Sequence, residues 1–232
     1  MSTLLLKLAA PLQAWGAESR FPRRTTRPEP TKSAVLGMVA SAQGRRRADS
    51  IEDLLGMYFG VRVDQPGVLV RDFQTAHRGK DSMPLSERYY LSDAVFIVGL
   101  EADISLLLGI RDALLCPAFP LFLGRRSCVP SGKLVIGIED AGLVDALRAH
   151  PWEASPWYKR RTASEPQLEL LRDVLPSDVG TENRETIQDE PLSFSQVRRD
   201  WGWREVVHDD PVTITGGKHA IVHDPMSALE AV

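Results

Sequence analysis

The hydrophobic pattern between the N-terminus and Ile138 is the feature that most constrains the fold. Apolar residues alternate or repeat with helical spacing, and their order predicts a strand, a helix, two strands, a second helix and a further strand. The predicted strands cover residues 3–8, 68–76, 88–100 and 134–138, with residues 61–63 leading into the second of them through a turn, and the predicted helices cover residues 31–44 and 103–116. This order is the split βαβ pattern, so we predict an α+β chain with a ferredoxin-like domain of the RNA-recognition type.

Two of these strands are predicted to form a long hairpin that projects from the domain. Pro66 and Gly67 suit a turn at the start of this ribbon, and the polar residues 79–84 suit its tip. The projecting hairpin is expected at about residues 69–98. A short helix at residues 50–60 and a short strand at residues 121–123 are expected outside it.

The second part of the chain has a different composition. From His150 onward the content of Pro, Trp and acidic residues rises, and only short strand candidates remain, at residues 168–174, 192–197 and 213–215. We therefore predict a first domain at residues 1–140 and a small β-rich C-terminal extension at residues 141–232. The pattern leaves open whether the extension is a separate subdomain or adds strands to the first sheet.

Positive charge is concentrated at the start of the chain. The whole sequence has 28 basic and 31 acidic residues, a formal charge of -3. Residues 1–50 contain nine basic and three acidic residues, whereas residues 51–232 contain the remaining 19 basic and 28 acidic ones. Such a division suits a protein that presents one basic face to a polyanion, although basic residues also serve simply to solvate a loop.

Several classes of protein are excluded by composition. The two cysteines, Cys116 and Cys128, are too few for a disulfide framework and lack zinc-site spacing, which indicates a reducing cytosol. No apolar stretch approaches the ~20 residues that cross a bilayer. Glycine-rich nucleotide loops and serine-esterase motifs are absent. We expect a cytoplasmic protein that has no membrane contact and no metal or other cofactor.

Four segments together carry a family resemblance. They are LAAPLQAWG (8–16), PTKSAVLGMVASAQGRRR (30–47), FGVRVDQPGVLVRDFQTAH (59–77) and LFLGRRSC (121–128). In this order they resemble the CasD family, the subunits of type I-E CRISPR Cascade complexes that belong to the repeat-associated mysterious protein superfamily. The resemblance spans about residues 3–138, with weaker similarity in DEPLSFS and REVV.

The resemblance implies a function, a set of neighbours and a thumb. It implies a ferredoxin-like domain with a protruding β-hairpin thumb and a small C-terminal region, and a role in gripping the 5′ handle of a CRISPR RNA (crRNA) in an antiviral ribonucleoprotein. The implied partners are the crRNA, the backbone subunit CasC and the large subunit CasA, with target DNA bound indirectly through the complex. It also implies that a separate nuclease, CasE, cuts the precursor, so this chain is not expected to be an enzyme.

Candidate RNA contacts follow from residue chemistry together with the resemblance. Backbone N–H groups at a helix start, with a hydroxyl and a cation, favour a phosphate. Guanidinium groups on loops and strands bind phosphate or stack on bases. RNA contacts are therefore predicted for Gln13, Arg20, Arg23, Arg24, Arg27, Thr31, Lys32, Ser33, Arg71, Gln74, Thr75, His77, Arg88, Tyr90, Gly124, Arg125, Arg126 and Ser127. Trp15 is predicted to lie in the core, and about half of the four arginines at 20–27 are expected to make no direct contact.

Two other functions stay open at this point. Some relatives in type I-C systems cut the precursor, and a metal-independent ribonuclease needs an acid and a base. His77 with Lys80 and Tyr89, or Lys218 with His219, would supply such a set. His219 and His223 have a helical metal-ligand spacing, but Gly216, Gly217 and the β-branched residues nearby favour a turn and strand, so no zinc is predicted. The second alternative is a protein-interaction scaffold whose RNA is held by neighbouring subunits.

Overall fold

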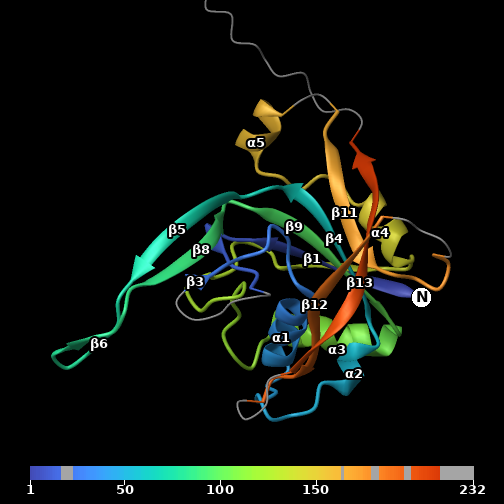
Figure 1. The fold of residues 1–232 in the computed structure, drawn as a ribbon. Coiled ribbons are helices and arrows are strands. Elements are labelled where there is room, and N and C mark those ends of the chain that lie inside the picture. Colours follow the sequence, from blue (N-terminus) through green and yellow to red (C-terminus); the bar gives the residue numbers. More distant parts are fainter. Residues whose placement is uncertain (17–22, 163–164, 179–182, 196–199, 215–232) are drawn as a thin grey trace, which may run out of the picture.

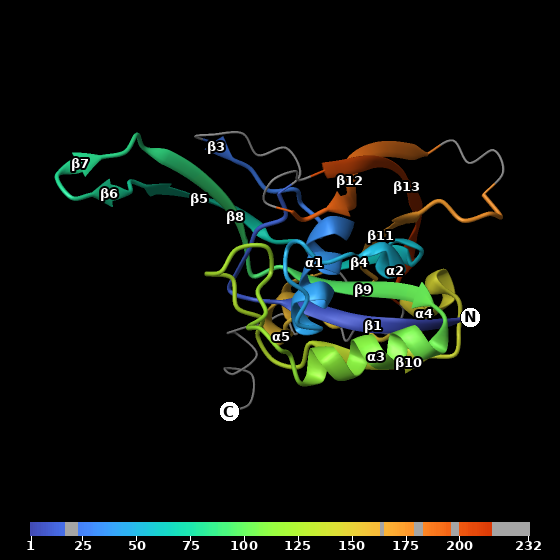
Figure 2. The same ribbon diagram turned by 90° about the horizontal axis from the view of Figure 1, so that it is seen from below.

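The computed structural model describes residues 1–16, 23–162, 165–178, 183–195 and 200–214. These residues form a seven-stranded sheet with helices on both faces, and a long arm projects from one end of it (Figures 1 and 2). The helices are α1 (Lys32–Ala42), α2 (Glu52–Leu55), α3 (Ile104–Leu115), α4 (Leu143–Ala149) and α5 (Pro156–Arg161). The strands are β1 (Ser2–Ala9), β2 (Leu12–Gln13), β3 (Arg23–Arg24), β4 (Tyr58–Gln65), β5 (Val68–Gln74), β6 (His77–Arg78), β7 (Asp81–Ser82), β8 (Ser86–Ser92), β9 (Val95–Ala102), β10 (Val135–Glu139), β11 (Gln167–Asp173), β12 (Arg184–Ser193) and β13 (Asp200–Thr213).

The main sheet has the strand order β10-β1-β9-β4-β11-β13-β12. Its neighbouring strands are antiparallel throughout. The predicted strands at residues 3–8 and 134–138 are confirmed as β1 and β10. The chain therefore places its first strand inside the sheet, between β10 and β9, where both faces can be covered.

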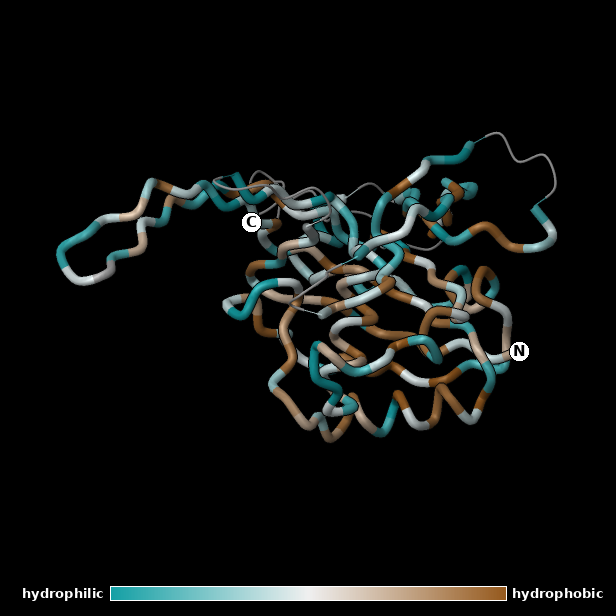
Figure 3. Tube along the Cα trace, turned by 60° about the horizontal axis from the view of Figure 1, so that its bottom comes forward, coloured by the Kyte–Doolittle hydropathy of each residue, from teal (hydrophilic) through white to brown (hydrophobic). Residues whose placement is uncertain are grey.

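Alternating side chains of β1 pack into two cores on opposite faces of the sheet. Leu4, Leu6 and Leu8 are fully buried against α1 and α3. Leu5 points to the other face and packs against α4. Gly99 in β9 permits this second layer, because a Cβ there would lie 2.6 Å from Cδ1 of Leu143. In Figure 3 hydrophobic segments are concentrated in this body, while the far loop of the arm is largely hydrophilic.

The two predicted long helices are confirmed, with different starts. The Asp103 carboxylate accepts a hydrogen bond from the Ser105 N–H at 2.8 Å and caps α3, as its sequence indicates. Thr31 precedes α1 at the predicted position, but its hydroxyl makes no capping hydrogen bond. Among the described residues, no helix is both long enough and apolar enough to cross a membrane.

The predicted single strand at residues 88–100 is wrong, because the chain changes sheets within it. Asp93, with a φ of 56°, separates β8 from β9. β9 lies in the main sheet, whereas β8 pairs with β5 to form the β5–β8 arm, residues 68–92. The arm therefore ends before Val95, and the strand before the Pro66–Gly67 turn, β4, pairs with β9 rather than with β5.

Two shorter elements also differ from the sequence expectation. The helix expected at residues 50–60 covers only α2, because Tyr58 already belongs to β4. Residues 121–123 form no strand, and the Leu123 N–H instead donates to the Cys128 carbonyl at 2.7 Å across a tight loop.

The C-terminal strands continue the main sheet. β11 pairs with β4, with Leu171 opposite Val61, and β13 and β12 follow in turn. β12 begins at Arg184, earlier than the strand predicted at residues 192–197, and β13 ends at Thr213, where the third short strand was expected to begin. Because β12 and β13 curve over the start of α1 (Figure 1), charged residues of the second half reach the first half.

Candidate nucleic-acid interface

An arginine-rich groove of about 700 Å³ opens beside α1. Small residues of α1 form its floor, and the segment after β3 and the loop of residues 120–125 contribute to its sides. Five arginines line it: Arg24, Arg45, Arg46, Arg47 and Arg125. No Asp or Glu occurs among the described residues that line this arginine groove. A concave surface with one sign of charge concentrates counter-ions, so the groove suits a polyanion.

Gly124 builds one side of the arginine groove. Its φ is +87°, and a Cβ at this position would lie 1.7 Å from the Ala14 carbonyl oxygen, so only glycine fits. The Ala14 N–H donates to the Leu123 carbonyl at 3.2 Å. Two segments that are distant in the sequence, at 8–16 and 121–128, thus form one wall.

Arg125 is held at the groove by contacts that leave its charge unmatched. Its Nη2 donates to the Arg24 carbonyl oxygen at 3.0 Å, and the guanidinium lies 4.4 Å from the centroid of the Tyr90 ring. Its Nη1 is buried and has no hydrogen-bond partner among the described residues. Neither contact supplies a negative charge, so Arg125 brings a net positive charge to this wall beside Arg24.

The three consecutive arginines beyond the end of α1 also line the arginine groove. Arg45 pairs with Asp53 through both of its terminal nitrogens. This hydrogen bonding holds the pKa of the Asp53 carboxyl below its ordinary value. The side chains of Arg46 and Arg47 have no polar partner in the part of the chain that the structure describes. Two unmatched charges thus face the groove from this end.

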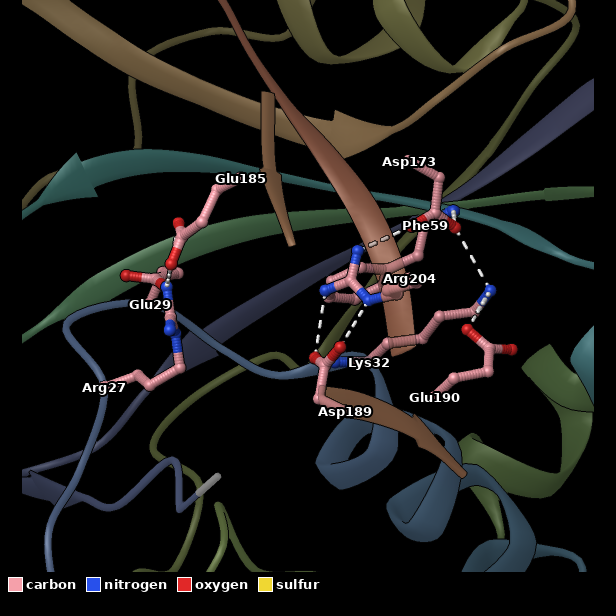
Figure 4. A network of polar contacts seen from close by, with 9 residues as sticks. All are labelled: Arg27, Glu29, Lys32, Phe59, Asp173, Glu185, Asp189, Glu190 and Arg204. Atoms are coloured by element: carbon pink, nitrogen blue, oxygen red, sulfur yellow. Dashed lines mark hydrogen bonds and ion pairs between the residues drawn. The ribbon is translucent and has the colours of Figure 1, made fainter. Parts of the chain in front are cut away.

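A second cationic cluster lies at the start of α1, and it is neutralised from within (Figure 4). The Lys32 ammonium lies 3.1 Å from carboxylate oxygens of both Asp173 and Glu190. Arg204 of β13 donates to Asp173 at 2.6 Å and to Asp189 at 2.9 Å. All five side chains are largely buried.

This cluster lies at the helix start where a phosphate contact is predicted for Thr31, Lys32 and Ser33. The Lys32 backbone N–H donates to the Asp189 carboxylate at 2.8 Å, so an internal anion already occupies the helix start. The Thr31 hydroxyl is buried without a partner among the described residues, whereas Ser33 lines the arginine groove. The acidic partners of Lys32 come from β11 and β12, in the second half of the chain, so its charge is matched within the fold.

The four arginines predicted on the loop at residues 20–27 have different positions. Arg24 lines the arginine groove. Arg23 lies against the Tyr89 ring, and its Nη2 donates to the Tyr89 hydroxyl at 3.2 Å. Arg27 pairs with Glu29 at 2.5 Å and with Glu185 at 3.0 Å, so two carboxylates match its charge. Arg20 lies outside the described residues.

The acidic partners of Arg27 titrate differently because their surroundings differ. Burial raises the pKa of the Glu29 carboxyl above its ordinary value, although the charge of Arg27 opposes this. Burial acts in the same direction on Glu185, but hydrogen bonds from Arg27 and His208 leave its pKa below the ordinary value. Arg27 therefore belongs to an internal ion network, as Figure 4 shows, and is poorly placed for a phosphate.

Gln13 and Trp15 both have structural positions. The Gln13 side chain is fully buried, and its amide donates to the Ala94 carbonyl at 2.7 Å. The amide thus ties β2 to the turn before β9, and the Gln13 backbone pairs with β8, so both parts of this predicted contact residue have partners within the fold. Trp15 is 1% exposed, and its ring packs edge-on against Phe96, which confirms the predicted core position.

The β5–β8 arm carries six predicted contact residues, but it does not gather them in one place. Arg71, Thr75 and His77 are exposed, Gln74 and Arg88 are half-buried, and Tyr90 is buried. Of these, Tyr90 reaches the arginine groove indirectly, because its ring supports Arg125. Arg126 and Ser127 are exposed beside Arg125 on the neighbouring loop without lining the groove.

The first alternative ribonuclease set does not bring His77 and Tyr89 together. Tyr89 is paired in register with Arg71. His77 follows Arg71 by six residues, so Tyr89 and His77 are about 20 Å apart along the arm. The second set, Lys218 and His219, and the histidine at 223 lie outside the described residues. The described part of the chain contains no group of three or more His, Cys, Asp or Glu side chains that could hold a metal ion.

Sequence reasoning missed part of the groove lining. Arg45, Arg46 and Arg47 were counted in the basic excess but not assigned to the site. Phe194 and Trp201 also line the groove, from the end of β12 and the start of β13. The excess of basic residues in residues 1–50 is a sequence signal for these three arginines. No local sequence pattern connects the aromatic residues to α1, because they lie near the opposite end of the chain.

Comparison with known proteins agrees with this architecture and places the chain in a family. Residues 3–207 match the family model of the CRISPR-associated protein (Cas_Cas5). The chain is 33% identical over 158 residues to the CRISPR system Cascade subunit CasD of Escherichia coli strain K12, covering 59% of this chain and 70% of that protein.

Two solved structures are also similar over most of the chain, and both show a mixed α/β fold of this kind. A chain of a CRISPR RNA-guided surveillance complex is 32% identical, with a TM-score of 0.76 over 91% of this chain and 90% of that chain. A crystal structure of a Cas protein is 37% identical, with a TM-score of 0.69 over 90% of this chain and 95% of that chain. The chain therefore belongs to the Cas5 family of CRISPR-associated proteins.

Proposed function

We propose that this chain is a non-catalytic RNA-binding subunit of a type I-E Cascade surveillance complex in antiviral defence. In this role its arginine groove grips the 5′ handle of the crRNA, and the subunit caps one end of the backbone filament. The observation that carries the proposal is the groove itself, which combines five arginines with no acidic residue among its described lining. Membership of the Cas5 family and the likeness to a chain of an RNA-guided complex support it.

The form of the groove favours single-stranded nucleic acid as its ligand. Guanidinium groups bind phosphate oxygens in a forked geometry and also stack on bases. Small side chains of α1, including Ala34, Gly37 and Ala40, leave an uncharged floor between the arginines, and Phe194 and Trp201 add aromatic surface. A positively charged groove with aromatic side chains is the usual arrangement of proteins that bind single strands.

The proposed function also suggests how the chain divides into domains. We assign residues 1–140 to a ferredoxin-like RNA-binding domain, the β5–β8 arm to its thumb, and residues 141–232 to a C-terminal extension. The order β10-β1-β9-β4, with α1 and α3 on one face, supports the first assignment. The extension shares its sheet with the domain through the β11–β4 pairing, so the two are expected to fold together.

The proposed neighbours are the crRNA and the protein subunits CasC and CasA, with target DNA bound through the complex as a whole. The β5–β8 arm leaves apolar side chains exposed, among them Val68, Leu69 and Phe73. Exposed apolar surface of this kind is typical of contacts with other proteins. The support for a binding rather than a cutting role is the separation of His77 from Tyr89, which leaves these two groups unable to act as acid and base at one site.

Crosslinking of the purified chain to repeat RNA tests the proposal. End-labelled repeat RNA is irradiated with the full chain in EDTA and separated on a denaturing gel. A slow crosslinked band with intact RNA is expected. A shorter RNA product that tracks with the protein would contradict the non-catalytic role, and the absence of any crosslink would assign RNA binding to the neighbouring subunits.

A charge-removal experiment then tests the groove as the site. Arg47→Ala removes one unmatched groove charge and is expected to reduce the dependence of log affinity on log salt concentration by about 0.7. Arg160→Ala removes an exposed charge from α5 and serves as the matched control. Equal effects of the two variants would show that binding is spread over the surface and would contradict the groove assignment.

A further inference from the structure

The outer face of β13 carries two exposed tryptophans at the edge of the arginine groove. Trp203 is 67% exposed and Trp201 is 36% exposed. A large aromatic side chain with two thirds of its surface in water has no role in the core. The described residues give neither indole a hydrogen bond nor an aromatic partner. Both rings therefore present aromatic surface that is not used within the described part of the chain.

The geometry of the strand places the two rings on one face. Residues two apart in a strand point to the same side, about 7 Å apart along the chain. Gly202 and Arg204 point to the opposite side, where Arg204 enters the buried ion network with Asp173. The backbone at Trp201 is fixed by pairing with Pro191 and by a hydrogen bond from the Gln188 amide to its carbonyl at 3.2 Å. Trp201 and Trp203 therefore place two aromatic rings on one face of a paired strand, and we call them the aromatic platform.

The platform is continuous with the groove. Trp201 itself lines the groove, on which Arg46 and Arg47 also open with unmatched charges. The next residue on the same face of the strand, Glu205, is bound by Arg184 at 2.9 Å and marks where the uncharged surface ends. A strand of nucleic acid whose phosphates contact the arginines would carry its bases onto these rings.

We infer that Trp201 and Trp203 form a stacking platform for unpaired bases of the RNA strand whose phosphates lie in the arginine groove. The inference rests on the proposed RNA-binding function and adds a second kind of contact to it. Every base has a π-face, so stacking on the platform depends on the presence of a base and little on its identity. The arginines provide the salt-dependent part of binding and the tryptophans provide the salt-independent part.

Binding measurements on the full chain separate these contributions. The probe is an unstructured RNA of about 10 nucleotides, within the range of site sizes of single-strand binding proteins. Trp203→Ala is expected to weaken binding by about 5- to 150-fold, the range found when a stacking aromatic is removed, with no change in salt dependence. Trp203→Phe, which keeps a ring, is expected to restore most of the affinity.

Two controls make the result specific to stacking. Leu192→Ala removes another exposed apolar side chain from the same hairpin, 51% exposed but packed beside Gly202 on the opposite face, and is expected to leave the affinity unchanged. An abasic strand of the same length is expected to bind equally to the wild type and to Trp203→Ala. A loss that persists on the abasic strand would overturn stacking as its cause.

Arg125→Ala distinguishes failure of the inference from failure of the proposed function. If Arg125→Ala weakens RNA binding and Trp203→Ala does not, the groove stands and the platform is overturned, which would leave Trp203 as a protein-binding surface. If neither variant weakens binding, RNA binding by the groove is overturned and the platform with it.

Discussion

The two ends of α1 carry opposite arrangements of positive charge. At its start, Lys32 and Arg204 are buried, and three carboxylates match them. Beyond its end, Arg46 and Arg47 open on a groove without a lining acid among the described residues. The same residue types therefore stabilise the fold at one end of the helix and remain available to a ligand at the other.

The difference shows that partners, rather than residue type, decide the role of a cation. A buried charge must be paired, because removal from water costs several kcal/mol per ion. A half-exposed arginine keeps its hydration and needs no internal partner. Four predictions test this contrast, in order of decreasing expected effect.

Loss of the acid at the start of α1 should have the largest effect on stability. Asp189→Ala leaves Arg204 and the Lys32 backbone N–H without their shared partner, and is expected to lower the free energy of unfolding by about 3–5 kcal/mol. Urea titration followed by circular dichroism measures it. Asp210→Ala, at an exposed position, is the control and is expected to stay within about 0.5 kcal/mol. A loss below about 1 kcal/mol for Asp189→Ala would contradict the neutralised cluster.

The groove wall should be the next most sensitive position. Gly124→Ala combines a positive φ with a clash against the Ala14 carbonyl, and is expected to cost about 2 kcal/mol or more. Gly132→Ala shares the positive φ, at +73°, but has open space around it, so it isolates the backbone term of about 1 kcal/mol. Equal unfolding free energies for the two variants would show that the close contact at Ala14 does not hold the wall.

Removal of single cations should separate binding from stability. Arg46→Ala is expected to leave the unfolding free energy within about 0.5 kcal/mol and to lower the salt dependence of RNA binding by about 0.7. Lys32→Met is expected to change the unfolding free energy and to leave the salt dependence of RNA binding unchanged, because Asp173 and Glu190 already match the charge of Lys32 within the fold. Filter binding at several salt concentrations gives both slopes. A lower slope for Lys32→Met would restore the helix start as a phosphate site.

Loss of the exposed Arg45–Asp53 pair should have the smallest effect on stability. Its arginine has an acidic partner, as at the start of α1, but the pair is exposed to solvent, as are Arg46 and Arg47. Because Arg45 lowers the pKa of Asp53, the pair stabilises the folded state above the ordinary carboxyl pKa, and this contribution is lost as the pH falls through the lowered value. Asp53→Asn is expected to cost less than about 1 kcal/mol near neutral pH and to remove this part of the acid sensitivity. Urea titrations between pH 7 and pH 3 measure the change. If Asp53→Asn and the wild type lose the same unfolding free energy between pH 7 and pH 3, the Arg45–Asp53 pair contributes nothing to stability.

The elements that sequence reasoning located best are those with strong periodicity. β1, α1, α3 and β10 appear where alternation and helical spacing predict them. The boundary at Asp93 was missed because it lies inside a continuous run of strand-forming residues, and a single aspartate with positive φ gives no pattern of its own. The residues at 121–123 are apolar for a different reason, since Leu123 fills the core from a loop.

The candidate site was predictable in part. Arg24, Gly124 and Arg125 were selected from their segments, and the structure brings them to one groove. Lys32 and Arg27 were selected by the same reasoning, but each has carboxylate partners that come from the second half of the chain. Trp201 and Trp203 lacked a signal because the strand that carries them is placed beside α1 by sheet pairing alone.

The sequence by itself determined where β1, β10 and the two long helices form and where positive charge is concentrated. Both properties depend on neighbours within a few residues, through side-chain periodicity and residue counts. Only the tertiary structure decided which cations are neutralised and which face the groove. Electrostatic pairing depends on distance through space and on burial, and carboxylates from the opposite half of the chain, Asp173 and Glu185, help to match Lys32 and Arg27.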